Sequence, residues 1–253
     1  MRHLSLRRLA AVLLMLFVPV AAARAEHPIV AKVRAYLGTE AALNAVKSVH
    51  YTGSMVAPNP ADPANPTHST IEIIFQAPYC QRTVRTTDAV IDTTALDIYD
   101  GWHRAQSVKD PTQQRLQVLP TPQVKRQRAI VWENLGFYRG LEREGGQVLD
   151  QGTAVLGGVT CRKLAFVHAD DIIFYRYFDE ASGRLVRSET ESGDAILEQG
   201  EILAGGIRFP KVIVNTLKGS DGKEQSITIT FDKITVNETF PESIFAVPSF
   251  SGK

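Results

Sequence analysis

The chain has 253 residues, of which 44% are hydrophobic and 22% are charged. This composition excludes wholesale disorder and is typical of one all-β domain or two small domains with a sizeable core. Without its first 25 residues the chain keeps 24 of its 28 Lys and Arg against 27 Asp and Glu, so the formal net charge changes from +1 to −3. A mildly acidic protein is not expected to bind nucleic acid as its main function.

The first 25 residues have the pattern of a secretory signal peptide. Three arginines precede an apolar run over residues 9–22, and Ala23-Arg24-Ala25 supplies a small-x-small cleavage site. Because the run is short for a membrane span, we expect cleavage after Ala25 and export to the periplasm, with an uncleaved N-terminal anchor as the alternative. No cysteine follows this site to carry a lipid anchor, so we expect a soluble protein.

The exported part is predicted to begin with helices and to continue with strands. Residues 27–49 have apolar positions at helical spacing, interrupted by Gly38, and Thr39 can N-cap a second short helix. The pattern then alternates as in strands over residues 50–57, 69–78 and 80–87. Residues 89–108 are predicted to form a hairpin whose turn is closed by Asp100-Gly101.

A helical segment separates this half from the next. Residues 110–145 hold the longest helical pattern of the chain, with Trp132, Phe137 and Tyr138 in its apolar band. Residues 171–231 then hold closely spaced strand patterns joined by short turns, and such strands must pair antiparallel. The sequence therefore predicts an α+β fold, a curved antiparallel sheet with helices on one face, as a single domain over residues 26–253.

The sequence carries no pattern that indicates catalysis. A GxSxG elbow, an HExxH metal motif and the glycine-rich loops of nucleotide-binding proteins are all missing from it. The acidic residues within 189–201 and the group formed by His168, Asp170 and Asp171 are explained more simply by water-facing strand charges and a solvated turn. We expect neither an enzyme nor a metal or cofactor site.

Two cysteines, Cys80 and Cys161, would be exported to an oxidising compartment. Exported pairs often form disulfides, but the sequence cannot fix the distance between the two Cα atoms. A disulfide and two separate buried thiols on strands both remain open at this point.

Some central strand residues are apolar or aromatic on both faces of the strand, as in residues 172–178. A sheet needs one apolar face to make a core, so a second apolar face indicates that something covers it. The helical segment over residues 110–145 could be this cover. If cover and sheet leave space between them, an apolar ligand could bind there, and if they do not, the core is fully packed.

Several segments in a fixed order resemble one known family, the LolA/LolB-like proteins of outer-membrane lipoprotein sorting. They are AYLGTEAALNAVKSVHYTGSM, IEIIFQAPYCQR, YDGWHR, VLGGVTCRKLAF, YFDEASGRLVR, GGIRFPKVIV and ITVNETFPESIFAVP. The resemblance implies a curved half-barrel whose concave face is covered by helices and holds acyl chains, in a periplasmic protein without catalytic residues. Because no lipobox cysteine is present, the chain is not an anchored receptor of the LolB type.

The leading hypothesis is a soluble periplasmic protein that holds a lipid or lipoprotein acyl chain as a carrier or sensor, with peripheral contact to a membrane. Arg82 and Arg85 are candidates for contact with a headgroup or for holding a helical lid closed, with a solvated strand arginine as the simpler role. The candidate cavity residues, chosen for size and position, are Tyr51, Phe75, Trp102, Trp132, Phe174 and Tyr177. The alternative hypothesis is an envelope scaffold domain that binds a protein partner and no lipid, through an exposed sheet edge and the proline-rich loop over residues 59–66.

Overall fold

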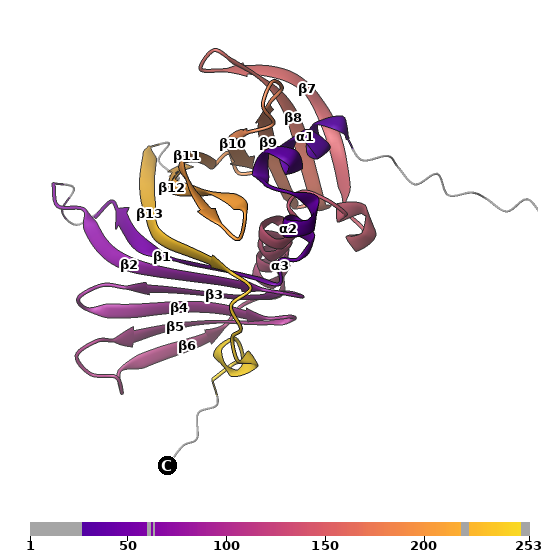
Figure 1. Cartoon of the computed structure of the whole chain (residues 1–253). Coiled ribbons are helices and arrows are strands. Elements are labelled where there is room, and N and C mark those ends of the chain that lie inside the picture. The colour runs from indigo at the N-terminus through magenta and orange to yellow at the C-terminus, as the bar shows by residue number, and fades with distance from the viewer. Residues whose placement is uncertain (1–26, 60–61, 63, 219–222, 249–253) are drawn as a thin grey trace, which may run out of the picture.

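The computed structural model describes residues 27–59, 62, 64–218 and 223–248, so the expected signal peptide over residues 1–25 lies outside the described residues. The described chain forms one antiparallel sheet of 13 strands that curves around three helices (Figure 1). No helix in these residues is long and apolar enough to cross a membrane.

The strands are β1 (Ser48–Ala57), β2 (Thr67–Gln76), β3 (Cys80–Thr86), β4 (Val90–Asp97), β5 (Asp100–Ser107), β6 (Gln114–Val118), β7 (Gln147–Leu156), β8 (Val159–Ala169), β9 (Ile172–Asp179), β10 (Leu185–Thr190), β11 (Ala195–Ala204), β12 (Ile207–Lys218) and β13 (Glu224–Val236). The helices are α1 (Pro28–Leu37), α2 (Glu40–Asn44) and α3 (Thr121–Gly136), with short 3₁₀ turns η1 (Leu141–Glu144) and η2 (Glu242–Ile244).

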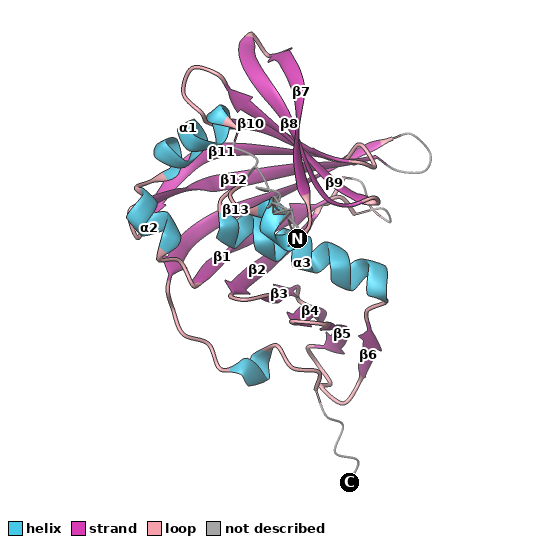
Figure 2. Cartoon of the chain, turned by 90° about the vertical axis from the view of Figure 1, so that its right-hand side faces the viewer, coloured by secondary structure: helices cyan, strands magenta, loops and turns pink. Residues whose placement is uncertain are grey.

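The strand order explains why α3 lies in the hollow of the sheet. The order is β6-β5-β4-β3-β2-β1-β13-β12-β11-β10-β9-β8-β7. Strands that are consecutive in the chain therefore pair with each other, except β6 and β7, and β1 pairs with β13. The strands β6 and β7 are consecutive in the chain but form the two opposite edges. Their connection must therefore span the hollow, and it does so as α3, which Figure 2 shows beside α1 and α2 on one side of the sheet. The predicted α+β sheet with helices over its concave face is confirmed.

Local chemistry sets the helix boundaries near the N-terminus as predicted. The Thr39 hydroxyl accepts a hydrogen bond from the Ala42 amide at 3.2 Å, so Thr39 N-caps α2 as its side chain allows. Between the two helices, Gly38 lies close to the Gly206 carbonyl oxygen, where a side chain would collide with it. The break between α1 and α2 therefore follows from a close backbone approach as well as from capping.

Two sequence-based boundaries were wrong. The turn between β4 and β5 lies at Ile98 and Tyr99, with Ile98 in a left-handed conformation at φ 53°, and Asp100-Gly101 begins β5 instead of closing the turn. The first part of the predicted helical segment over residues 110–145 forms β6, an edge strand with little burial. An edge strand exposed on both faces has no alternating apolar pattern, so periodicity could not reveal it.

The curvature of the sheet depends on a bulge in β1. The pairing of β1 with β13 shifts register between Thr52 and Gly53. A Cβ atom at Gly53 would collide with the carbonyl oxygen of Thr230, so only glycine fits this position. Bulges of this kind increase the local twist of a strand, and this one lies at the junction between the two halves of the sheet.

The core has two main parts, one on each side of α3. In the first, Val124 and Val131 of α3 pack with Phe75, Leu96 and other residues of the β1–β5 half. In the second, α1 and α3 pack against Phe166, Phe174 and other residues of β8 and β9. The helix therefore joins the two arms of the sheet through apolar contacts on opposite faces.

A buried arginine joins all three helices. Arg34 is only 1% exposed, and its guanidinium donates to the carbonyl oxygens of Gly136 and Phe137 at 3.1 and 3.0 Å, at the C-terminal end of α3. It also forms a two-pronged pair with Glu40 at 2.9 Å for both bonds, and it donates to the Asn44 side chain at 3.0 Å. Its hydrogen bonds hold the pKa of Glu40 below its usual value. These bonds satisfy carbonyl groups that a helix end leaves without partners.

The two cysteines are not joined. Cys80 on β3 and Cys161 on β8 are both buried, and each is free. Seven other strands lie between β3 and β8 in the sheet order, so no disulfide can bridge them. Of the two alternatives, two separate buried thiols is the one found.

Replacing Arg34 tests its role in the fold. Arg34→Ala should lower the free energy of unfolding by about 3–5 kcal/mol, because the α3 carbonyl groups and Glu40 lose a buried, charged partner. The measurement is urea unfolding followed by circular dichroism. Arg115→Ala, which removes an exposed arginine from β6, is the matched control and should change stability by less than about 0.5 kcal/mol. Equal effects of the two substitutions would contradict the account.

Candidate functional site

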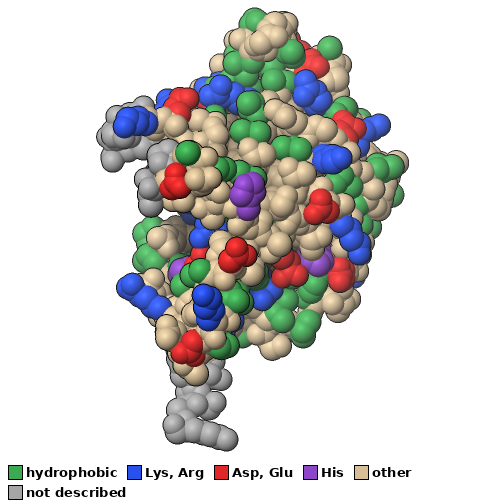
Figure 3. All heavy atoms as spheres, turned by 90° about the vertical axis from the view of Figure 1, so that its left-hand side faces the viewer, with side chains coloured by type: hydrophobic (Ala, Val, Ile, Leu, Met, Phe, Trp, Pro, Cys, Tyr) green, Lys and Arg blue, Asp and Glu red, His purple; other side chains and the backbone are tan. Residues whose placement is uncertain are grey.

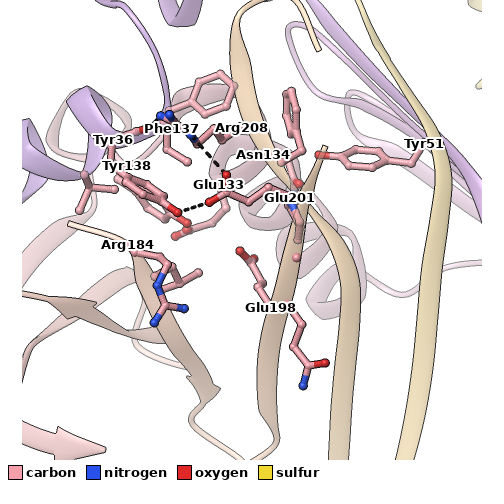
Figure 4. A pocket seen from close by; sticks show the side chains of 17 residues that line it. Tyr36, Tyr51, Glu133, Asn134, Phe137, Tyr138, Arg184, Glu198, Glu201 and Arg208 are labelled. Atoms are coloured by element: carbon pink, nitrogen blue, oxygen red, sulfur yellow. Dashed lines mark hydrogen bonds and ion pairs between the residues drawn. The ribbon is translucent and has the colours of Figure 1, made fainter. Parts of the chain in front are cut away.

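A cavity of about 380 Å³ lies between the end of α3, the helix α1 and the strands β11 and β12. Its apolar walls include Val33 and Leu37 of α1, Phe137 after α3, and Phe209 of β12. Figure 4 shows that its side chains come from all of these elements and that Tyr51 reaches it from β1. The volume falls near the lower limit of known small-molecule sites, which span about 300–1,000 Å³. The complete lining is Val33, Tyr36, Leu37, Tyr51, Glu133, Asn134, Phe137, Tyr138, Arg184, Leu185, Glu198, Gln199, Gly200, Glu201, Arg208, Phe209 and Pro210.

One group of polar residues pairs at the side of this cavity formed by α1, β11 and β12. The hydroxyl of Tyr36 donates a short hydrogen bond to Glu201, and the Arg208 Nε atom lies 3.4 Å from the same carboxylate. The guanidinium of Arg208 also lies over the Tyr36 ring at 5.3 Å. Burial, together with the neighbouring carboxylate, raises the pKa of Tyr36 to about 12. This group is partly exposed, and its charges are already matched.

A second group lies on the buried face of α3. Glu133 is 8% exposed and its carboxylate lies 3.0 Å from His168 Nε2 and 3.1 Å from an Arg176 Nη atom. Burial alone would raise the pKa of Glu133, but the charge of Arg176 and the hydrogen bond with His168 outweigh it, so the pKa is lowered. A buried carboxylate that stays ionised in this way needs its partners, and β8 and β9 supply both.

Three further polar groups in the cavity have no protein partner. Glu198 of β11, Tyr51 of β1 and Tyr138 after α3 all line the cavity, and no hydrogen bond to a described residue acts on any of the three groups. Burial raises the pKa of Glu198, against a weaker opposing effect of the charge of Arg176. Burial also raises the pKa of both tyrosines, and the charge of Glu198 adds to this. The three groups are therefore close enough to interact electrostatically, and none of them is hydrogen-bonded to a described residue.

The backbone that places two of these walls is unusual. Phe137 and Tyr138, directly after α3, have φ values of 46° and 69°, in the left-handed region that non-glycine residues rarely adopt. The conformation turns the chain sharply, so both side chains contribute to the cavity. Arg34 binds the carbonyl group of Phe137, so the same contact that ends the helix holds this strained turn.

Of the six aromatic residues predicted to line a cavity, the structure places only Tyr51 in this one. Phe75 packs edge-on against Tyr51 within the core, and Phe174 lies in the core beside α3. Trp102 is 3% exposed and donates to the carbonyl oxygen of Phe245 at 2.7 Å, on the C-terminal segment. Large aromatic side chains on strands mostly fill the core, because there they bury the most area.

The remaining two aromatic residues lie elsewhere. Trp132 packs against Phe166 and His168 and lines a smaller space on the other side of α3. The Tyr177 hydroxyl donates to Glu189 at 2.7 Å and its ring lies under Lys163. Because neighbouring strand residues face opposite sides and Arg176 faces α3, Tyr177 faces away from the cavity.

The predicted headgroup residues are paired on the sheet and do not line the cavity. Arg82 bonds to Glu72 at 2.7 Å, and Arg85 pairs with Asp92. Both fit the simpler role of a strand arginine. On the face in Figure 3, basic and acidic side chains of the described residues are interspersed, so this face lacks the single-sign potential that steers a highly charged partner.

The structure adds residues that sequence reasoning missed. Glu133 was a charged residue within an apolar helical band, and that position was its only signal. Glu198 was assigned to water-facing strand charges, whereas it lines the cavity. In the described residues no group of three or more His, Cys, Asp or Glu could hold a metal ion.

Comparison with solved structures identifies the architecture. A DUF1329 family protein from Desulfovibrio piger aligns with a TM-score of 0.54 at 6% identity, over 86% of this chain and 95% of that one. A LolA superfamily protein from Nitrosomonas europaea aligns with a TM-score of 0.53 at 10% identity, over 85% and 97%. The chain has a LolA-like fold. The expected resemblance is confirmed at the level of the fold.

A third structure extends the same LolA-like comparison. A domain assigned to an outer membrane lipoprotein-sorting protein of Vibrio parahaemolyticus aligns with a TM-score of 0.54 at 12% identity, over 86% of this chain and 94% of that one. No protein-family model matches the sequence, and no curated protein matches it significantly. The LolA-like likeness is therefore one of structure, at low sequence identity.

The buried pair of Glu133 and Arg176 gives a pH-dependent prediction. Glu133→Gln should lower the free energy of unfolding by about 3 kcal/mol near neutral pH, because Arg176 stays buried without its counter-charge. The folded-state pKa of Glu133 lies below the unfolded value of about 4.3, so its contribution is present above that value and is lost as the pH falls through the folded pKa. The difference in the free energy of unfolding between wild type and Glu133→Gln should therefore become smaller in acid.

Urea unfolding at pH values of about 7 and about 3 measures this difference across the titration of a carboxylate. Glu142→Gln, at an exposed position in η1, is the control and should be neutral at both values. A difference between wild type and Glu133→Gln that stays constant with pH would show that the carboxylate charge is not what stabilises the pair.

Proposed function

We propose that this protein holds a single apolar chain, a lipid or lipoprotein acyl chain, in the cavity under the end of α3. The observation that carries the proposal is the cavity itself, whose walls combine the apolar side chains of Val33, Leu37, Leu185 and Phe209 with many polar and charged residues. An amphiphile needs apolar walls for its chain and polar groups that fix its head, and this lining supplies both. A volume of about 380 Å³ suits one chain and not several.

The fold supports the same proposal. The structure from Vibrio parahaemolyticus with a similar fold is assigned to outer membrane lipoprotein sorting. Fold similarity at 12% identity does not carry function by itself, so the cavity remains the main support. The described residues that line it include no Ser, Thr, Cys, His or Lys, so binding is proposed and catalysis is not.

A periplasmic location is part of the proposal. It rests on the sequence of residues 1–25, with its basic start, apolar run and small-residue site. A protein in that compartment would meet acyl chains at the membrane surfaces that it contacts peripherally.

A charge placed in the cavity should abolish binding. Leu185→Arg should weaken the affinity for a neutral fluorescent acyl probe by at least about tenfold, because an unpaired guanidinium against an apolar chain costs several kcal/mol. Leu203→Arg is the matched control, since Leu203 is 71% exposed on β11 and does not line the cavity. A fluorescence titration measures the affinity of the wild type and of each of the two variants.

Circular dichroism must first confirm that both variants are folded. Binding that is unchanged in Leu185→Arg would place the ligand outside this cavity. No binding of the neutral acyl probe by the wild type would instead favour the second candidate, an envelope scaffold domain. In that case the exposed edge strands β6 and β7 are the first surfaces to test for a protein partner.

A further inference from the structure

The polar groups of the cavity leave one carboxylate without a counter-charge. Glu133 pairs with Arg176 and His168, and Glu201 pairs with Arg208 and Tyr36. Glu198 has no such partner among the described residues, because Arg176 directs its hydrogen bonds to Glu133 at 3.1 and 3.3 Å. The one other cation in the lining, Arg184, is exposed to solvent. Glu198 is therefore the one carboxylate of the described lining that has no ion-pair partner.

The hydroxyl groups of two tyrosines line the same cavity as the Glu198 carboxylate. Tyr51 and Tyr138 both line the cavity, feel the charge of Glu198 and make no hydrogen bond to any described residue. A phenol oxygen can accept a hydrogen bond, as a carboxylate can. Three acceptors from β1, β11 and the end of α3 thus line the same cavity (Figure 4).

We propose that the cavity selects an amphiphile with a primary ammonium head, which binds Glu198 while its apolar tail lies along the walls. This inference rests on the proposed function and names the class of ligand. An ammonium group has three N–H donors, and Glu198, Tyr51 and Tyr138 supply three acceptors. The aromatic rings of Tyr51 and Phe209, whose centroids lie 5.9 Å apart, give the cation further favourable contacts.

The charge of the head decides between ligand classes. A carboxylate head would meet the charge of Glu198 directly and be disfavoured. A hydroxyl head could form hydrogen bonds but would leave the carboxylate without a counter-charge. Burial already disfavours the ionised form of Glu198 and raises its pKa. A bound cation would supply the counter-charge that favours the ionised form.

The test compares three ligands with the same ten-carbon tail: decylamine, decanol and decanoate. Each displaces a neutral fluorescent acyl probe from the protein purified from a periplasmic preparation. In the wild type, decylamine should displace the probe at a concentration about tenfold lower than decanol, and decanoate should be the weakest. Glu198→Gln should remove the advantage of decylamine and leave displacement by decanol within about twofold of the wild type.

Glu201→Gln is the matched control, because Glu201 lines the same cavity from the same strand but is already paired. It should keep most of the preference for decylamine. Equal displacement by decylamine and decanol in the wild type would overturn the inference while leaving the proposed function intact. An equal loss of preference in both variants would assign the effect to the general charge of the cavity and not to Glu198. A probe that never binds would instead refute the proposed function.

Discussion

The guanidinium group of Arg34 holds the C-terminal end of α3 in place, and the cavity depends on that position. It joins the carbonyl groups of Gly136 and Phe137 to Glu40 and Asn44, so the three helices meet at one buried charge. Helix ends leave such carbonyl groups without intrahelical partners, and a buried cation that accepts this role must itself be fully bonded. The left-handed turn that follows then directs Phe137 and Tyr138 into the cavity.

Much of the fold could be predicted from the sequence because most of the sheet is built from neighbouring strands. Alternating residues and turn residues are local signals, and they located the hairpins of β8 to β13. The pairing of β1 with β13 is not local, and no local pattern identifies β13 as the distant partner of β1. The strand β6 and the turn at Ile98 were missed because one is exposed on both faces and the other places a β-branched residue in a left-handed conformation.

The site was harder to predict than the fold, for a physical reason. A large aromatic side chain indicates burial, and most buried side chains belong to the core. Phe75, Trp102 and Phe174 are therefore in the core, and of the six aromatic residues predicted to line a cavity only Tyr51 lines this one. The residues that distinguish the cavity are charged, and their roles depend on partners far away in the chain. Glu133 needs residues on β8 and β9 from the other arm of the sheet, and the sequence gives no sign of this pairing.

The central claim is that a space between helices and sheet is a ligand site and not a gap in the packing. Native mass spectrometry of the protein from a periplasmic preparation, followed by organic extraction of what it carries, tests this most directly. The account predicts a bound species with one apolar chain in near-stoichiometric amount, released on unfolding, because a cavity of about 380 Å³ has room for one chain. A protein mass without any adduct, together with failure to bind a neutral fluorescent acyl probe, would contradict it.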